Sequence, residues 1–318
     1  GAMLTAASVI FPVIAIIALG FFLVRANMFT PHQNTALNKF VFMIAAPALL
    51  FRNVAVTEFP EATPWGLWLS YYLVMFGCMA LSIGLARVLM PRRSGAACVI
   101  IGFGSSFSNT VMLGIPIILT AFGEAAALPL FLVLAFHGLL IFSTGILLME
   151  LTTASSRSLR GAIAALPQAL SNQSVLIALL AGVLWNISGL NLPGPADRFL
   201  DILGQAAIPL ALVAIGGTLA TVPVRRTVGV AVYMSGFKLV LQPAATYGVA
   251  NFVFGLPPLW VATITLLAAM PTGMLASVLA EQYRAASGAA SSSIMVSCMA
   301  AIATLSFWLT FFAPLLRA

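Results

Sequence analysis

The sequence predicts an all-α polytopic membrane protein with ten transmembrane helices. Hydrophobic residues make up 62% of the 318 residues and charged residues only 7%, whereas about a quarter of the residues in a soluble globular domain are charged. Ten apolar runs follow one another, each close to or above the ~20 residues that cross a bilayer as a helix. The loops between these runs are alternately rich and poor in Lys and Arg, as expected when successive loops lie on opposite sides of a membrane.

The apolar runs fill nearly the whole chain, whose mean hydropathy is +1.11. The first run has no basic residue before it and no small-residue cleavage site after it, so we expect a membrane span rather than a signal peptide. A polar segment of residues 151–172 follows the fifth run, and we interpret it as a cytoplasmic linker. In order, the runs cover residues 5–24, 33–53, 65–90, 94–122, 125–150, 173–189, 199–220, 227–254, 258–282 and 290–316.

The linker separates a first five-helix repeat, residues 1–150, from a second five-helix repeat, residues 173–318. Because each half has an odd number of spans, the second half must enter the membrane in the opposite orientation. Two such halves are typical of inverted-repeat transporters.

Loop charges predict the orientation, because short loops rich in Lys and Arg stay in the cytoplasm. The side with few basic residues has Arg52, Arg198 and Arg317, and both termini fall on it. We therefore expect a bacterial inner (plasma) membrane protein with both termini in the periplasm. The loops after odd-numbered spans contain Arg25, Lys39, Arg87, Arg92, Arg93, Arg157, Arg160, Arg225, Arg226 and Arg284.

Topology and contact with anionic membrane lipid account for the net charge of +7, so nucleic acid is not an expected partner. Cys78, Cys98 and Cys298 lie inside apolar runs without the short paired spacing of a disulfide framework or a metal site. We expect no metal and no cofactor.

Two runs contain residues that interrupt helices at mid-membrane. The fourth contains Gly104-Ser105-Ser106-Phe107-Ser108-Asn109-Thr110 before Pro116, and the ninth contains Met270-Pro271-Thr272-Gly273. Breaks at Ser108, Pro116 and Pro271 free backbone groups that lipid cannot satisfy. We predict that broken helices 4 and 9 cross, so that their N-terminal amides bind a carboxylate. The alternative is that the two prolines only kink packed helices.

The interrupted segments resemble those of the auxin efflux carrier family, which includes the PIN-type plant carriers and bacterial malonate-type transporters. The similarity extends over nearly all ten spans, and the residues that carry it are Ser108-Asn109-Thr110-Val111-Met112-Leu113-Gly114-Ile115-Pro116, Met270-Pro271-Thr272-Gly273 with Ala280 and Tyr283, Leu37-Asn38-Lys39-Phe40-Val41 before Pro47, Lys238-Leu239 before Pro243, and Glu150. The resemblance implies a scaffold domain from spans 1, 2, 6 and 7 and a transport domain from spans 3–5 and 8–10. It also implies an elevator-like movement and a homodimer formed through the scaffold domain.

The chain departs from the PIN carriers in two places. Those carriers have proline at the position of Ser108, so this break can be softer, with serine hydroxyls available to backbone or substrate. They also have an acidic residue in the third span, and residues 65–89 contain none. Any role of that acid in coupling transport to an ion therefore does not carry over to this chain.

The candidate substrate-binding residues lie in and around the two breaks. Asn109, between Ser108 and Thr110, can donate its amide to a carboxylate and can also cap the broken helix. Thr272, before Gly273, can bind the same anion, or its hydroxyl can bond back to its own helix.

Two ionisable residues within spans are further candidates. His137, where the resemblance places a glutamine of PIN-type carriers, can donate a hydrogen bond to substrate, carry a coupled proton, or rest as a neutral imidazole on a backbone carbonyl. Lys238 can pair with substrate or hold unwound carbonyls from behind, and we favour the second role because a permanent ion pair would hinder release.

These residues predict a secondary transporter of a small organic anion, a mono- or dicarboxylate such as malonate or malate or an auxin-like acid, working by alternating access. The coupling ion is H⁺ or Na⁺. A sodium-coupled carrier similar to the bile acid symporters and an anion channel are the alternatives. We do not expect an enzyme, because no Asp lies at mid-membrane, no H-E-x-x-H occurs, and a Ser105 or Ser106 nucleophile with His137 as base lacks a recognisable motif.

Overall fold

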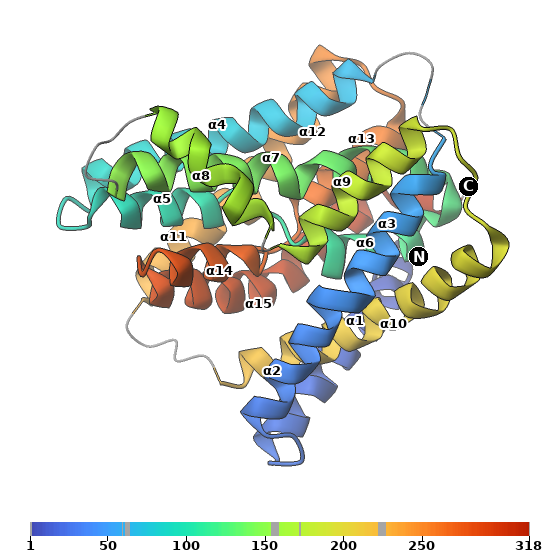
Figure 1. Cartoon of the computed structure of the whole chain (residues 1–318), viewed down its shortest axis with the longest axis horizontal. Coiled ribbons are helices and arrows are strands. Elements are labelled where there is room, and N and C mark those ends of the chain that lie inside the picture. Colours follow the sequence, from blue (N-terminus) through green and yellow to red (C-terminus); the bar gives the residue numbers. More distant parts are fainter. Residues whose placement is uncertain are drawn as a thin grey trace.

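The computed structural model describes residues 2–58, 60, 64–153, 159–171, 173–221 and 227–317. Every regular element in these ranges is a helix (Figure 1). Of the basic residues that predict the orientation, Arg157, Arg225 and Arg226 lie outside the described residues.

The first half contains four long helical stretches and one interrupted stretch. Several helical stretches continue through a π-helical turn without a gap in the helix. Its elements are α1 (Ala2–Arg25), α2 (Pro31–Phe40), η1 (Val41–Ala45), α3 (Ala46–Val56), α4 (Trp65–Leu89), α5 (Gly95–Gly104), η2 (Thr110–Gly114), α6 (Ile115–Phe122), η3 (Gly123–Ala126) and α7 (Ala127–Thr153).

The second half repeats this pattern of long and interrupted stretches. Its elements are α9 (Ser174–Ile187), α10 (Gly194–Leu219), α11 (Val228–Gly236), η4 (Phe237–Leu241), α12 (Gln242–Gly248), η5 (Val249–Val253), α13 (Pro258–Ala268), α14 (Leu275–Gln282), α15 (Ser287–Phe311) and η6 (Ala313–Arg317).

The segment predicted as a linker contains a further helix, α8 (Leu159–Ser171). Leu159, Ile163 and Leu166 recur at helical spacing between small residues and Arg160, a pattern typical of an amphipathic helix. The helix packs against α7 and α9, while residues 154–158 and 172 of the same segment lie outside the described ranges.

Six helical stretches of the described chain are long and apolar enough to cross a membrane: Pro31–Val56, Trp65–Leu89, Thr110–Thr153, Gly194–Leu219, Val228–Val253 and Ser287–Phe311. Shorter apolar helices cover Phe11–Arg25, Gly95–Gly104, Ser174–Ile187 and Pro258–Ala268. Two of these short helices are the first parts of the interrupted fourth and ninth runs. The helices indicate a multi-pass membrane protein, and the ten-span inverted repeat stays a prediction.

The helices α1, α2, α3 and α10 pack on one another at one side of the molecule, in blue and yellow in Figure 1. Small residues bring α1 and α10 into close contact, because a Cβ atom on Gly216 would overlap the carbonyl of Ile17 and one on Gly20 would overlap the carbonyl of Val213. Such reciprocal small residues are a common way for membrane helices to pack. Helix α9 completes this group by packing along α3.

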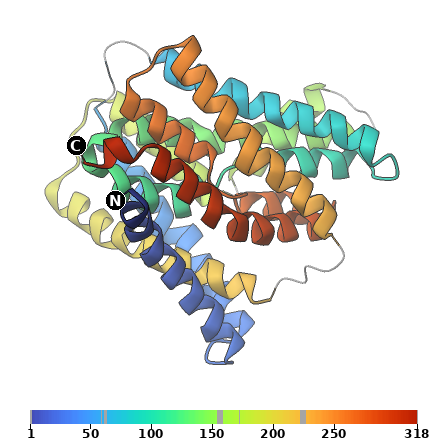
Figure 2. The same ribbon diagram turned by 180° about the vertical axis from the view of Figure 1, so that it is seen from behind.

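The remaining long helices form a second group in which α4 packs on α5, α5 on α7, α11 on α15 and α12 on α13. Figure 2 shows this group from behind, with both chain termini close together on one side of the molecule. The second part of the first interrupted stretch reaches the other group, since α1 contacts α6 and α10 contacts η2. This contact puts the break before η2 at the boundary of the two groups.

Candidate functional site

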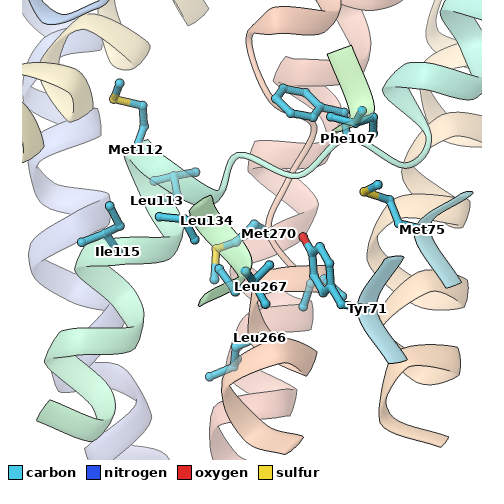
Figure 3. Packing of buried hydrophobic residues seen from close by; sticks show 14 of the residues in the cluster. Tyr71, Met75, Phe107, Met112, Leu113, Ile115, Leu134, Leu266, Leu267 and Met270 are labelled. Carbon is cyan, nitrogen blue, oxygen red and sulfur yellow. The ribbon is translucent and has the colours of Figure 1, made fainter. Parts of the chain in front are cut away.

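The two interrupted stretches cross inside the protein. Helix α5 ends at Gly104 and η2 begins at Thr110, while α13 ends at Ala268 and α14 begins at Leu275. Between these ends the chain is extended, and Ser108 pairs with Thr272 in an isolated antiparallel bridge. In Figure 3 the extended segment that carries Phe107 runs across the segment that follows Met270.

Backbone hydrogen bonds hold this crossing together. The amide of Asn109 donates to the carbonyl of Pro271 at 2.8 Å, and the amide of Gly273 donates to the carbonyl of Phe107 at 2.9 Å. Each break therefore satisfies backbone groups that the other exposes, as membrane-buried backbone requires. The predicted break at Pro116 is wrong, because α6 continues η2 directly and Pro116 lies inside this one helical stretch, where its missing amide falls on the π-helical turn. Pro271 does lie in a break, between α13 and α14, and so does more than kink a helix.

The side chain of Asn109 is positioned at the beginning of the helical stretch η2–α6 but does not cap it. Its backbone carbonyl accepts hydrogen bonds from the amides of Leu113 and Gly114 at 3.3 and 3.1 Å. Its Nδ2 atom is buried and has no hydrogen-bond partner in the described part of the chain, and the same holds for Oγ of Ser108. Buried polar groups without partners are costly, so these two atoms are available to a ligand.

A cavity of about 580 Å³ lies next to the crossing. One wall consists of residues around the two breaks, and the opposite wall consists of residues from the group formed by α2 and α10. The crossing contributes Phe107, Ser108, Asn109, Thr110, Gly273 and Met274, and the opposite wall includes Thr35, Asn38, Lys39, Phe42, Ile215 and Thr218. Four of the predicted substrate-binding residues therefore share one cavity: Ser108, Asn109, Thr110 and Gly273.

Thr272 is buried at the crossing and lies outside the wall of this cavity. Its hydroxyl donates to the carbonyl of Gly104 at 2.9 Å, and its amide donates to Oγ of Ser297 at 3.0 Å. Gly104, whose carbonyl accepts from the Thr272 hydroxyl, is the last residue of α5, which precedes the other break. This hydroxyl connects the two breaks and does not bond back to its own helix, which was the alternative to binding the anion; the role of Thr272 in binding the anion stays a prediction.

We expect Thr272→Val to lower the thermal midpoint of unfolding, because it leaves the buried carbonyl of Gly104 without its partner at a cost of about 1–3 kcal/mol. Thermal unfolding of the purified protein in detergent measures the change. Thr144→Val is the matched control, since the Thr144 hydroxyl bonds to Leu140 at an exposed position of α7. Equal midpoints for the two variants would contradict the role given to Thr272.

His137 lies behind the crossing, on α7, and is also absent from the cavity wall. Its Nε2 atom is 3.3 Å from the carbonyl oxygen of Ser108, and it donates to that oxygen in the tautomer that carries the proton on Nε2. The imidazole stacks on Phe107, with ring centres 5.2 Å apart and planes 9° apart, and meets Tyr71 edge-on at 5.5 Å. This geometry fits a neutral histidine that supports the backbone of the break.

Lys238 is wholly buried in η4, and its Nζ atom donates to the carbonyl of Ala268, the last residue of α13. It does not belong to the cavity wall. A cation at a helix C-terminus is stabilised by the helix dipole. Of the two predicted roles, the contact matches the one in which Lys238 holds carbonyls of the break from behind.

Sequence reasoning did not identify the opposite wall of the cavity. Asn38 donates to Oγ1 of Thr218 at 3.2 Å, which joins α2 to α10 there, and Lys39 places a cation on the same wall. The sequence does contain a pattern that indicates this wall, because Asn34 and Asn38 are polar residues one helical turn apart in an apolar run. Tyr71, beside His137, was also missed, and its hydroxyl has no partner among the residues that the structure describes.

Arg52 is engaged elsewhere in the structure. Its guanidinium binds Asp197 through two nitrogens, at 2.7 and 3.1 Å, and Asp201 at 3.1 Å. Two carboxylates thus neutralise this arginine where α3 meets α10. This ion-pair network joins α3 to α10.

The sequence of this chain is similar to a family of known proteins. A family model described as "Membrane transport protein" matches residues 5–309. The chain is 28% identical over 295 residues to a Rhizobium meliloti (strain 1021) protein named "Putative malonate transporter", covering 93% of this chain and 92% of the relative. It is 26% identical to an uncharacterized transporter of Methanothermobacter thermautotrophicus, covering 93% and 95%, and 24% identical to the uncharacterized transporter YfdV of Escherichia coli (strain K12), covering 94% and 95%. The chain belongs to this family of membrane transport proteins, the auxin efflux carrier family.

Proposed function

We propose that this protein is a secondary transporter of a small organic anion, a mono- or dicarboxylate of the malonate class. The observation that supports this most is the buried, unpartnered Nδ2 of Asn109, a residue of the cavity wall at the N-terminal end of η2–α6. An amide donor beside a helix N-terminus suits a carboxylate. The similarity to a relative named for malonate supports the same class of substrate.

Transport then proceeds by alternating access, with the group around α4, α5, α7 and α11–α15 moving past the group of α1, α2, α3, α9 and α10. The cavity supports this division, because its two walls come from different groups. The moving group is the transport domain and the other is the scaffold domain, through which we propose that two copies form a homodimer. Both termini are periplasmic in this proposal, so the loop between α1 and α2 is cytoplasmic. Thr35 and Lys39, near this end of α2, line the cavity, which therefore opens toward the cytoplasm.

Sodium is not required in this proposal. In sodium-coupled carriers with broken helices, unwound carbonyls and helix C-terminal ends coordinate the ion. Here the ammonium group of Lys238 already binds the carbonyl at the end of α13. A tethered cation at this position takes the place that a free cation would otherwise fill.

Uptake by proteoliposomes tests the proposal. Purified protein is reconstituted, and radiolabelled malonate, malate and an uncharged analogue are supplied with an imposed proton gradient, a sodium gradient, or neither. We expect saturable malonate uptake, exchange against internal malonate, and no effect of sodium. Flux without saturation or exchange would indicate a channel, and dependence on sodium would favour a carrier similar to the bile acid symporters. No flux of any carboxylate would refute the proposal.

We expect His137→Gln to retain malonate exchange and His137→Leu to lose most of it. Glutamine can still donate to the carbonyl of Ser108, whereas leucine leaves that carbonyl unpaired at a cost of about 1–3 kcal/mol. Exchange and gradient-driven accumulation are measured side by side. If His137→Gln keeps exchange but loses accumulation driven by a proton gradient, His137 carries the coupled proton and the supporting role is wrong.

A further inference from the structure

A second, smaller hollow lies at the end of the molecule where α4 turns into α5. Its volume is about 450 Å³, and it lies between the ends of α4, α5 and α7. It shares no residue with the cavity at the crossing. Its lining residues are Arg87, Pro91, Arg93, Gly95, Leu151 and Thr152.

Positive charge converges on this hollow from two independent sources. The guanidinium of Arg87 reaches the first turn of α5, where a Cβ atom on Gly95 would lie 3.7 Å from Nη2 of Arg87 and 3.7 Å from Cγ2 of Thr152. The N-terminus of a helix carries a partial positive charge of about half a unit. Arg93, from the turn between the helices, adds a second guanidinium to the lining.

Among the described residues no ion pair is found for Arg87 or Arg93, and Glu150, the carboxylate next to the lining residue Leu151, accepts from the hydroxyl of Tyr283 at 2.7 Å. The lining contains no carboxylate, and the ion pairs recorded within the described ranges involve only Arg52. The Ser94 hydroxyl accepts from the amide of Ala97 at 3.1 Å, so it caps one amide of the first turn and leaves the earlier ones directed outward. Arg87 itself stands in the last turn of α4, where the helix dipole favours a cation. An anion between Arg87 and the first turn of α5 would meet both the guanidinium and the positive end of α5.

The surface next to the hollow is apolar. Val88 and Leu89, which follow Arg87 on α4, are 74% and 63% exposed. Exposed apolar side chains at the end of a membrane-spanning helix face acyl chains or the lipid boundary. A ligand in the hollow would therefore have its charged part between arginines and its remainder beside apolar side chains.

We propose that this hollow binds the phosphate group of an anionic phospholipid in the cytoplasmic leaflet. Arginine forms charge-assisted, often bidentate hydrogen bonds with phosphate, and basic pockets between membrane helices on the cytoplasmic side bind lipid headgroups. Arg87 and Arg93 hold the phosphate oxygens against the first turn of α5, and Val88 and Leu89 lie along the acyl chain. Free phosphate offers the same oxygens but nothing for the apolar surface.

Lipid binding by the purified full-length chain tests this site without any transport assay. The thermal midpoint in detergent is measured with phosphatidylglycerol, with phosphatidylcholine, and with inorganic phosphate at matched ionic strength, and native mass spectrometry measures the lipid that remains bound. The variant is Arg87→Gln with Arg93→Gln. Arg25→Gln, an exposed arginine in the last turn of α1, is the matched control.

We expect phosphatidylglycerol, but not phosphatidylcholine, to raise the midpoint of the wild type and of Arg25→Gln. In the double variant the affinity for phosphatidylglycerol falls at least about tenfold, the factor that corresponds to losing about 1.4 kcal/mol of charge-assisted bonding. Arg87→Lys with Arg93→Lys keeps the charges, and we expect it to retain part of the binding if the double glutamine variant folds poorly.

Three results would overturn the proposal. Equal stabilisation of the wild type and both double variants would show that the lipid binds elsewhere. A loss of binding in Arg25→Gln as large as in the double glutamine variant would show that only overall surface charge matters. Stabilisation by inorganic phosphate alone that the double glutamine variant loses would make free phosphate, and not lipid, the ligand.

Discussion

Asn109→Ala is expected to raise the KM for malonate exchange about 10- to 100-fold while leaving the protein folded. The substitution removes a donor to a charged ligand, and such hydrogen bonds contribute about 1.5–3 kcal/mol. Folding should be little affected, because Nδ2 of Asn109 has no partner within the described protein that could be lost. Exchange of radiolabelled malonate over a range of external concentrations gives KM and the maximal rate separately.

Two further variants make this test specific. Asn109→Asp keeps the shape of the side chain but adds a negative charge, so we expect it to abolish binding of an anion more completely than alanine does. Asn191→Ala, in the exposed turn before α10, is the control for loss of an asparagine elsewhere. If Asn109→Ala and Asn191→Ala have the same KM, the carboxylate binds at another place and the assignment of this cavity fails.

Lys238→Met is expected to lower malonate uptake about 5- to 150-fold without lowering the thermal midpoint of unfolding. Methionine keeps much of the length of the side chain but cannot donate to the carbonyl of Ala268. Losing this hydrogen bond destabilises the geometry of the break after α13 by about 1–3 kcal/mol, and uptake falls accordingly. The fold itself gains from the removal of a buried charge, because desolvating an ammonium group is costly. Opposite effects on uptake and on stability are therefore the expected signature.

The control for Lys238→Met is Val240→Met, which changes an exposed side chain of the same helical turn. Uptake is measured with and without sodium for both variants. If Lys238→Met unfolds at a lower temperature than Val240→Met, Lys238 is needed chiefly for the fold and its role at the break is overstated. If wild-type uptake needs sodium, the proposal that the lysine replaces the ion is wrong.

The places where the helices are interrupted could be predicted from the sequence. Proline lacks a backbone donor and limits the residue before it, and glycine weakens a helix wherever it stands. These are local properties, so Gly104 to Thr110 and Met270 to Gly273 identified the breaks without knowledge of their surroundings. Asn109 could be selected for the same reason, as a polar side chain within a break.

The partners of the other candidate residues could not be predicted in this way. Thr272 binds the carbonyl of Gly104, 168 positions away in the chain, and no local pattern connects the two. His137 and Lys238 stand out because ionisable residues are rare in spans. Their acceptors, however, are carbonyls of Ser108 and Ala268, and every residue of the chain has a carbonyl.

Hydropathy, loop charge and the position of prolines and glycines thus establish a helical membrane protein with two interrupted helices, because each of these signals depends on a residue and its near neighbours. The wall of α2 and α10 that faces the crossing, with Asn38 and Lys39 on it, follows from the packing of distant segments. In a chain this apolar, both lipid-facing and protein-facing sides of a helix are hydrophobic, so periodicity does not distinguish them. Which polar side chains share a cavity is decided by which helices pack together, and that depends on contacts between the two halves of the chain.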